Sequence, residues 1–525
     1  MTTSSNSVTS ASSSTSEPTL PKADSVDVLL LLEGTFPYVA GGVSSWVNQI
    51  IRAYPELRFG AIFIGSQPSD YGAMRYALPD NLVHLDVVYL AENKPSAKIR
   101  PTKVKADPDT MVQVKRMHEL FQTNIRHPDC PHLFSSTMDE AHAGGKLSHE
   151  TFLHSEAAWE HIKDSYLRYS TDPSFVDYFW TIRTIHTPLW RLREIAQNCP
   201  KARIYHSVST GYAGVLGLLL KHQNPRPYIL SEHGIYVKER KIDLYQAQWI
   251  KDNRSVFDHD PSQVSYYRQI WIRFFEHLGY LTYQSADHIV ALYEANRQRQ
   301  LADGAPPERT SNIPNGIDVE RFAPLRAIRP ASPPPILCLI GRVVPIKDIK
   351  TFIRSMRSVV ARLPEAQAWI AGPEEEDPDY AQECHELAER LGLAHCIKFM
   401  GFQKLTDILP QVGLVVLSSI SEALPLVILE GYAAGVPTVS TDVGSCRQLV
   451  YGLPGDDAAI GVSGRIVRIA DPEALGAAAL ELLTDDAAWH SASQAAIRRV
   501  EAYYAQHMMF DRYRNLYTEG LAWQA

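Results

Sequence analysis

The sequence predicts an α/β protein built from two doubly wound domains. Three observations support this class: short apolar runs of strand length recur along the chain, helix-like segments separate most of them, and a Pro-rich segment divides the series in two. Such alternation is typical of a parallel sheet with helices on both faces. The length of 525 residues also favours two hydrophobic cores over one.

Composition narrows the class of protein. Residues 1–24 are mostly Ser, Thr and other small or polar types, without a basic start or an apolar core, so we predict a disordered tail rather than a secretory signal. No apolar run approaches the ~18 residues of a membrane span. A net charge of -8 argues against a nucleic-acid partner. The six scattered cysteines form no C-x-x-C pair, which indicates reduced thiols in a cytosolic protein.

The first domain is predicted over residues 25–325. It opens with a wholly apolar strand at 26–32, followed by a Gly-rich loop and an amphipathic stretch at 44–54. Further strand-like runs lie near residues 60, 202, 227 and 287. Residues from about 92 to 185 interrupt this rhythm, because they are polar, rich in His and aromatic residues, and poor in strand-like runs. We predict a mostly helical insertion there.

A Pro-rich linker at 323–335 separates the two series of strands, and the second domain is predicted over residues 326–500. Its five apolar runs, ILCLI, QAWIA, IKFM, LVVL and PTVST, are short enough for buried strands. The chain ends in a helix-like segment at about 502–518. We expect the C-terminal segment, residues 501–525, to pack back on the first domain.

The stretch SSISEALPLVILEGYAAGVPTVS, residues 418–440, places two glutamates eight positions apart. Glu422 lies in a loop at the carboxyl end of a strand, the edge at which open α/β sheets bind ligands. Pro425 suits the first turn of a helix, and Gly435 ends it. Glu430 lies inside that helix among apolar residues. It either faces water on the polar side of the helix or needs a basic partner or a hydroxyl-bearing ligand, because a buried unpaired carboxylate is costly.

Two other loops carry groups suited to anions. Arg342 and Lys347 follow the strand ILCLI, and fixed cations of this kind can stabilise a diphosphate without a metal, although a surface role is the simpler alternative. In GTFPYVAGGVSSWV, residues 34–47, Gly41 and Gly42 allow close backbone approach, and Ser44 or Ser45 can cap the helix that follows. Two interpretations stay open: free N–H groups there bind a phosphate, or the glycines serve only a tight turn.

The segment SEHGIYVKERKIDL, residues 231–244, follows another strand and contributes His233, Lys238 and Arg240. A lone His at a strand end is usually structural. His206 in IYHSVSTG lies at a similar strand end and is a weaker candidate for a site residue. Gly401 and Phe402 follow the strand IKFM at the same kind of edge.

The pattern E-A-x-P-x-x-x-x-E-G-x-A-A-G-x-P-x-V resembles the E-x7-E signature of the retaining glycosyltransferases of family 4, which have the GT-B fold. That fold has two Rossmann-like doubly wound domains facing a cleft, and the resemblance implies that the first domain lies on the acceptor side and the second binds the UDP-sugar. The resemblance implies that Glu430 accepts hydrogen bonds from both ribose hydroxyls of a UDP-sugar and that Glu422 contacts the transferred sugar. It also assigns the diphosphate to Arg342 and Lys347.

The same resemblance implies roles for the remaining candidates. The loop at Gly41 and Gly42 would reach the donor phosphate across the cleft. His233 would hydrogen-bond the donor sugar or the acceptor. Backbone groups of Gly401 and Phe402 would meet the uracil, and positive charge in the cleft would come from Lys238 and Arg240.

The segments LLEGTFPYVAGGVSSWV, LRFGAIFIGS, RYALPDNLVHL and SEHGIYVKERKIDL are similar to the cytosolic glycosyltransferases of Pel-type exopolysaccharide synthesis. This likeness covers roughly residues 26–450. It implies transfer from UDP-N-acetylhexosamine or UDP-glucose to a growing polysaccharide of the biofilm matrix. A cytoplasmic location beside export or synthesis proteins of the inner membrane is also implied.

We expect neither a metal nor another cofactor. The two D-P-D triplets, at 107–109 and 377–379, lie in polar segments rather than at strand ends, and the spacing of His127, Cys130 and His132 matches no zinc pattern. Two alternatives stay open at this point. One is another enzyme class, a UDP-sugar epimerase or a sugar phosphorylase, and the other is a UDP-binding regulatory subunit without transferase activity.

Overall fold

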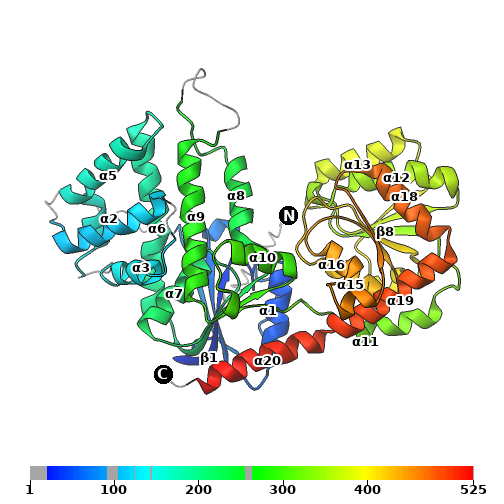
Figure 1. Cartoon of the computed structure of the whole chain (residues 1–525), viewed down its shortest axis with the longest axis horizontal. Coiled ribbons are helices and arrows are strands. Elements are labelled where there is room, and N and C mark those ends of the chain that lie inside the picture. Colours follow the sequence, from blue (N-terminus) through cyan, green and yellow to red (C-terminus); the bar gives the residue numbers. More distant parts are fainter. Residues whose placement is uncertain (1–19, 92–104, 124–125, 142–144, 255–262, 524–525) are drawn as a thin grey trace, which may run out of the picture.

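The structure is a computed structural model that describes residues 20–91, 105–123, 126–141, 145–254 and 263–523. These residues form two lobes, and each lobe is built around one sheet of parallel strands (Figure 1). The predicted α/β class with two doubly wound halves is therefore confirmed.

The first sheet has the strand order β3-β2-β1-β4-β5-β6-β7. Strand β1 lies inside this sheet, between β2 and β4, and is buried along most of its length because helices cover both faces. This burial explains the unbroken apolar run in the sequence. The strands are β1 Ser25–Glu33, β2 Phe59–Gly65, β3 Leu82–Tyr89, β4 Lys201–Ser207, β5 Tyr228–Glu232, β6 His288–Ala291 and β7 Thr310–Asn312.

The second sheet has the order β10-β9-β8-β11-β12-β13. Its strands are β8 Ile336–Ile340, β9 Gln367–Ala371, β10 Ile397–Gly401, β11 Leu414–Leu417, β12 Thr438–Thr441 and β13 Gly464–Val467. In each sheet the chain order reverses beside one strand: β1 lies between β2 and β4, and β8 lies between β9 and β11. The loops that diverge at such a reversal leave a crevice at the carboxyl ends of the strands.

Three strands were not predicted from the sequence, and all three lie at the edge of a sheet: β3 and β7 in the first and β13 in the second. Edge strands contact a neighbour on one side only, so they do not need a long apolar run. β7 has only three residues, TSN, and β3 interrupts its apolar residues with His84 and Asp86.

Helices of the first lobe flank its sheet. They are α1 Gly42–Ala53, α7 Tyr212–Gln223, α8 Tyr236–Gln246, α9 Tyr266–Ser285 and α10 Glu294–Ala302, with short 3-10 turns at Pro68–Asp70 and Pro307–Arg309.

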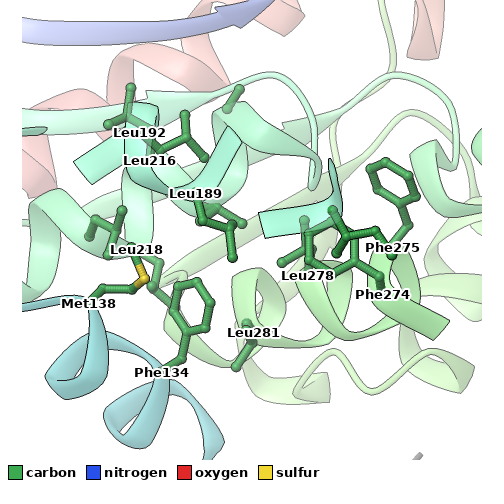
Figure 2. Packing of buried hydrophobic residues seen from close by; sticks show 14 of the residues in the cluster. Phe134, Met138, Leu189, Leu192, Leu216, Leu218, Phe274, Phe275, Leu278 and Leu281 are labelled. Atoms are coloured by element: carbon green, nitrogen blue, oxygen red, sulfur yellow. The ribbon is translucent and has the colours of Figure 1, made fainter. Parts of the chain in front are cut away.

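The connection from β3 to β4 is helical, in the region where the sequence predicts an insertion. Its helices are α2 Pro108–Thr123, α3 Cys130–Asp139, α4 His149–His154, α5 Glu156–Tyr169 and α6 Phe175–Asn198. The helical part continues to residue 198 rather than stopping near 185, and residues 92–104 of the predicted insertion lie outside the described residues. Figure 2 shows its attachment, in which Phe134 and Met138 of α3 pack among side chains of α7 and α9 such as Leu218 and Leu281.

Helices of the second lobe surround its sheet in the same way. They are α12 Ile349–Arg362, α13 Pro378–Arg390, α14 Leu405–Ile408, α15 Leu426–Ala433, α16 Cys446–Tyr451, α17 Asp456–Ala459, α18 Pro472–Leu483 and α19 Asp486–Tyr503, with 3-10 turns at Pro345–Lys347 and Leu409–Gln411. The predicted linker contains α11 Val319–Phe322 and the 3-10 turn Ala323–Ile328.

The last helix, α20 Gln506–Ala522, leaves the second lobe and packs on the first (Figure 1). Tyr517 of α20 is buried there, and its hydroxyl lies 2.8 Å from Nδ1 of His206 in β4. The helix begins at Gln506 rather than near 502. The reason is a backbone contact at the crossing, where the N–H of Ile317 donates to the carbonyl of Tyr504 at 3.0 Å and the N–H of Gln506 donates to Ile317 at 2.9 Å.

Residues 20–24 belong to the tail predicted as disordered, yet they lie beside the first sheet. The carbonyl of Pro21 accepts the N–H of Leu85 at 2.8 Å, and that of Asp24 accepts the N–H of Lys201 at 2.9 Å. Residues 1–19 of the predicted tail lie outside the described residues. In the described part of the chain, no helix has both the length and the apolar character needed to cross a bilayer.

Candidate active site

Two loops of the second lobe meet at the reversal point of its sheet. One follows β8 and carries Arg342 and Lys347, and the other follows β11 and carries Glu422. The loops are joined by hydrogen bonds: the N–H of Ile420 donates to the carbonyl of Ile346 at 2.9 Å, and the Ser418 hydroxyl donates to the carbonyl of Lys347, also at 2.9 Å. Side chains far apart in the sequence are therefore held at one place.

Lys347 and Glu422 form the closest contact between predicted site residues. The Lys347 ammonium donates to Oε1 of Glu422 at 2.5 Å, and the Ser419 hydroxyl donates to the same oxygen at 2.7 Å. Both charged side chains are largely buried, with 18% and 15% of their surface exposed. The pair leaves a compact, partly desolvated charge centre at the carboxyl edge of the sheet.

Arg342 lies in the same loop but faces a different carboxylate. Its guanidinium pairs with Glu376, and about half of each side chain is exposed. The backbone of this loop packs closely against Gly372. Only glycine fits there, because a Cβ at position 372 would lie 1.9 Å from the carbonyl oxygen of Gly341. Any side chain at position 372 would therefore displace the residue that precedes Arg342.

The loop of Glu422 has a similar support. Gly444, with φ of +52°, packs so closely that a Cβ would lie 2.3 Å from the carbonyl oxygen of Glu422. The next residue, Ser445, donates its N–H to the carbonyl of Ala423 at 2.9 Å. Neither Gly372 nor Gly444 stands out in the sequence, since isolated glycines after strands are common.

Glu430 lies in α15, and Gly435 follows the helix with φ of +77°, the left-handed geometry of a glycine stop. Burial raises the pKa of Glu430, and the positive charge of Arg321 partly opposes that rise. Among the described residues, the Glu430 carboxylate has no hydrogen-bond partner. Glu430 is half-buried, so water reaches this carboxylate in part, and a ligand with hydroxyl groups would also supply hydrogen bonds to it.

Gly401 and Phe402 lie at the end of β10, which is separated from β8 by β9. Gly401 has a φ of +60°, and the Phe402 side chain is 83% exposed. These residues share the carboxyl edge with Arg342 and Lys347 but touch neither of them through a described side-chain hydrogen bond.

Of the helices that follow strands of the first sheet, α1, α7 and α8 begin near the predicted site residues, and the protein itself fills the N-termini of α7 and α8. At α7, Oε2 of Glu33 accepts the N–H groups of Tyr212 and Ala213 at 2.7 and 3.3 Å. At α8, Oε1 of Glu232 accepts the N–H of Tyr236 at 3.0 Å. A carboxyl group accepts the free N–H groups in both places. Burial raises the pKa of Glu232 to about 7, so at pH 7 the charge that faces the helix dipole is complete only after this group loses its proton.

The third N-terminus, that of α1, differs. Its N-cap is Gly41, with no side-chain hydrogen bond, so the prediction that Ser44 or Ser45 caps the helix is wrong. The helix starts at Gly42, which places Ser44 inside its first turn, where the side chain is buried. A Cβ at Gly41 or Gly42 would meet nothing within 4 Å, so an incoming group has space beside both residues, although the Gly41 N–H already donates to the Tyr76 hydroxyl at 3.5 Å.

His233 follows β5 beside these helices. Its side chain is 6% exposed, its ring lies 4.7 Å from that of Trp46 between centroids, and its Nε2 atom has no partner among the described residues. Burial lowers the pKa of His233 to about 4, so the imidazole is neutral at pH 7. His206, in contrast, is enclosed between Tyr517 and Ser231 at 2.8 Å each, which is a structural role.

A cavity of about 640 Å³ opens at this edge of the first lobe. His233 and Arg240 line it, together with Glu33 and aromatic side chains of α8 and α9. Arg240 donates to the Tyr236 hydroxyl at 3.3 Å and to Asp243 at 3.4 Å, and lies 3.9 Å from Glu33. Lys238 is exposed on α8 and does not line the cavity.

The structure thus brings the candidates together in two groups. Arg342, Lys347 and Glu422 meet in the second lobe, and His233 and Arg240 share the first-lobe cavity. No hydrogen bond or ion pair among the described residues joins the two groups. Sequence reasoning missed Glu33 and Tyr236, which line the cavity and bond to each other at 2.7 Å. The only available signal for Glu33 was its place at the end of β1.

The two D-P-D triplets have helix-capping roles. Asp107 accepts the N–H of Thr110 at 3.0 Å at the start of α2, and Asp377 accepts the N–H of Tyr380 at 3.1 Å at the start of α13. Among the described residues, no three His, Cys, Asp or Glu side chains are arranged to hold a metal ion.

Two family models match the chain. The model described as "Domain of unknown function (DUF3492)" matches residues 26–308, which is more than half of the sequence. The model described as "Glycosyl transferases group 1" matches residues 334–485, the stretch that contains both charged loops of the second lobe.

The curated relatives align with this chain over only part of their own length. A D-inositol 3-phosphate glycosyltransferase 2 from Catenulispora acidiphila is 32% identical over 205 residues, covering 36% of this chain and 44% of the relative. A D-inositol 3-phosphate glycosyltransferase from Geodermatophilus obscurus is 30% identical over 209 residues, covering 37% and 44%. The chain thus spans less than half the length of these relatives.

Solved structures resemble nearly the whole chain. Sucrose-phosphate synthase from Thermosynechococcus elongatus aligns with a TM-score of 0.53 and 17% identity, over 94% of this chain and 98% of that one. Anabaena HepE in complex with UDP aligns with a TM-score of 0.56 and 15% identity, over 94% and 100%. These likenesses confirm the GT-B fold with its helical insertion in the first lobe.

Proposed function

Because the chain belongs to the family described as "Domain of unknown function (DUF3492)" and carries a group 1 glycosyltransferase domain in a GT-B fold, we propose that it is a retaining glycosyltransferase of family 4. It transfers a sugar from UDP-N-acetylhexosamine or UDP-glucose to a growing exopolysaccharide of the Pel type, in the manner of PelF. The enzyme acts in the cytoplasm beside proteins of polysaccharide synthesis and export in the inner membrane.

One observation carries this proposal: the loops after β8 and β11 bring Lys347 and Glu422 together at the reversal point of the second sheet, 2.5 Å apart. A UDP-sugar presents a dianionic linker next to a polyhydroxyl ring. A lysine beside a glutamate can bind these two neighbouring parts. The ammonium group binds the diphosphate, and the carboxylate accepts hydrogen bonds from the sugar hydroxyls.

The remaining residues complete the donor site in this proposal. The two oxygens of the Glu430 carboxylate accept hydrogen bonds from the ribose hydroxyls, and this carboxylate is half-buried with no hydrogen-bond partner among the described residues. Arg342 exchanges Glu376 for the diphosphate, and the open N-terminus of α1 at Gly41 and Gly42 meets the phosphate from the other lobe. Backbone groups of Gly401 and Phe402 face the uracil.

The reaction breaks the bond from the anomeric carbon to the diphosphate and forms a bond from that carbon to an acceptor oxygen. The acceptor's proton passes to the departing phosphate, so UDP leaves and the sugar retains its configuration. Lys347 and Arg342 stabilise the charge that develops on the diphosphate. His233, neutral at pH 7, has a free ring nitrogen for a hydroxyl of the donor or acceptor.

Replacement of Glu430 tests the proposal directly. We expect Glu430→Ala to weaken UDP binding by at least about 100-fold, since two hydrogen bonds to a charged group are lost. Calorimetry with UDP measures this, and Glu389→Ala, an exposed carboxylate on α13, is the matched control. Unchanged UDP affinity in Glu430→Ala would contradict the donor site.

The proposal includes no metal cofactor, since cationic side chains supply the charge. Transfer from a UDP-sugar, scored by UDP release, is therefore expected to continue in excess EDTA at the rate seen without it. Loss of activity that magnesium or manganese restores would contradict this expectation. Conversion of the UDP-sugar without an acceptor, into its epimer, would instead indicate an epimerase.

A further inference from the structure

The first-lobe cavity has one wall made of aromatic side chains. Trp249 and Trp271 meet edge to face with ring centroids 5.5 Å apart, and Trp271 stacks on Phe275 at 6.1 Å and 21°. Trp271 is only 7% exposed, whereas Trp249 is 63% exposed at the rim. A large exposed indole at a cavity mouth provides a flat apolar face that a ligand can cover.

The rest of the cavity lining is polar and mostly acidic. Its lining residues carry three carboxylates, Glu33, Glu239 and Asp243, against one guanidinium, Arg240, and His233 is neutral at pH 7. Arg240 is engaged by Glu33, Asp243 and the Tyr236 ring. The lining therefore has a net negative charge, which repels anions.

Of the helix N-termini beside the cavity, those of α7 and α8 are closed to an anion, and that of α1 belongs to the donor diphosphate in the proposed function. Glu33 already fills the N-terminus of α7, and Glu232 fills that of α8, where the Tyr236 N–H is its partner. Glu33 also accepts the Tyr236 hydroxyl at 2.7 Å, so these groups are held in place before a ligand arrives. A phosphate would have to displace a carboxylate at either helix.

From this combination, we propose that the first-lobe cavity is the acceptor site and binds an uncharged saccharide chain against Trp249 and Trp271, while it excludes phosphorylated polyols. The C–H face of a pyranose ring is apolar and flat, so it packs on an indole, while its hydroxyls bond to Glu33, Arg240 and Nε2 of His233. The volume of about 640 Å³ lies within the usual range for small-molecule sites.

This inference rests on the proposed glycosyl transfer and adds the side chains that hold the acceptor and the anionic ligands that the site excludes. It separates this chain from relatives whose names contain D-inositol 3-phosphate, an anionic polyol. Discrimination by repulsion of the wrong ligand, in addition to attraction of the right one, is a common source of specificity.

The test is direct binding without a donor, measured by calorimetry on the full chain. The probes are the uncharged tetrasaccharides chitotetraose, cellotetraose and maltotetraose, with D-inositol 3-phosphate as the contrast. We expect at least one tetrasaccharide to bind and the inositol phosphate to give no heat of binding. Trp249→Ala should weaken tetrasaccharide binding about tenfold or more, in line with the loss of one aromatic contact.

The control is Trp159→Ala, which removes a tryptophan of comparable exposure (47%) on α5 and should leave binding unchanged. Both tryptophans are exposed, so neither variant should fail to fold. The inference is overturned if no tetrasaccharide binds, if Trp249→Ala binds as the unmodified chain does, or if inositol phosphate binds instead.

UDP binding on the same samples separates the two proposals. If UDP binds in a Glu430-dependent way and the tetrasaccharides do not bind, only the acceptor inference fails. If a tetrasaccharide binds through Trp249 but UDP does not bind, the proposed function fails and the saccharide site remains.

Discussion

Lys347 is held by Glu422 before any donor is present, and this pairing distinguishes its role from that of Glu430, which has no partner among the described residues. A lysine that binds diphosphate and a glutamate that binds ribose should respond differently to ligands that contain only one of these parts. A comparison of UDP with uridine, which contains the ribose but no diphosphate, therefore separates the two assignments.

We predict that Lys347→Ala weakens the binding of UDP by about 10- to 100-fold and leaves the binding of uridine unchanged, because charge-assisted bonds to the diphosphate are lost. Glu430→Ala should weaken both ligands, since both contain the ribose. Titration calorimetry with UDP and uridine measures the difference, and Lys404→Ala, an exposed lysine of the second lobe, serves as the control. Equal loss for both ligands in Lys347→Ala would argue against a diphosphate role.

At the scale of elements, the helical insertion contains a cluster of buried histidines. His118 in α2 lies 2.8 Å from His161 in α5 between ring nitrogens, and the His118 ring centroid lies 4.5 Å from that of His186 in α6. Burial lowers the pKa of His161 and of His186 to about 4, and it also lowers that of His118. All three imidazoles are therefore neutral at pH 7.

This cluster makes the stability of the insertion depend on pH. The unfolded histidines, with pKa near 6.5, take up protons below that pH while the folded ones do not, so the unfolded state binds more protons and stability falls as the pH drops from about 6.5 toward 4. We predict faster amide hydrogen exchange in α2, α5 and α6 at pH 5 than at pH 7, after correction for intrinsic rates. Helices α12 and α18 of the second lobe should change less, and an equal change in all these helices would contradict the prediction.

The elements also show the limits of sequence patterns. The central strands β1, β8 and β11 were predicted because burial on both faces requires apolar residues at successive positions. Three of the four edge strands, β3, β7 and β13, were not predicted, since a strand with a neighbour on one side only can lack a long apolar run. The fourth, β10, was predicted because it keeps the apolar run IKFM. The helix α15 was predicted closely because its limits depend on local chemistry, Pro425 before it and Gly435 after it.

At the scale of the whole molecule, the chain passes between the lobes twice, and the two passages touch. Ile317 in the first passage forms a parallel bridge with Ala505 in the second, and α20 then spans the underside of the first lobe (Figure 1). A Cβ at Gly316 would lie 2.6 Å from Cα of Gln506, so glycine allows this backbone contact. Any rotation of one lobe against the other must pass through these residues.

We predict that Gly316→Ala lowers the rate of sugar transfer several-fold or more and leaves the affinity for UDP within about twofold, because the donor site lies in the second lobe while the lobes must meet for transfer. Turnover assays and UDP calorimetry on one preparation measure the two effects. Gly72→Ala, where a Cβ would meet nothing within 4 Å, is the control. Normal turnover in Gly316→Ala would show that the contact does not affect the reaction.

The sequence by itself determined the α/β class, the two doubly wound halves, the helical insertion and the strand–loop–helix setting of Glu422 and Glu430, because burial, helix ends and turns act over a few residues. Only the tertiary structure decided that Lys347 pairs with Glu422, that Gly372 and Gly444 support their loops, and that Glu33 and Glu232 fill helix N-termini beside an aromatic cavity. The physical reason is distance along the chain: these contacts join residues from different strands and helices, and no local pattern specifies which side chain will meet another across the edge of a sheet.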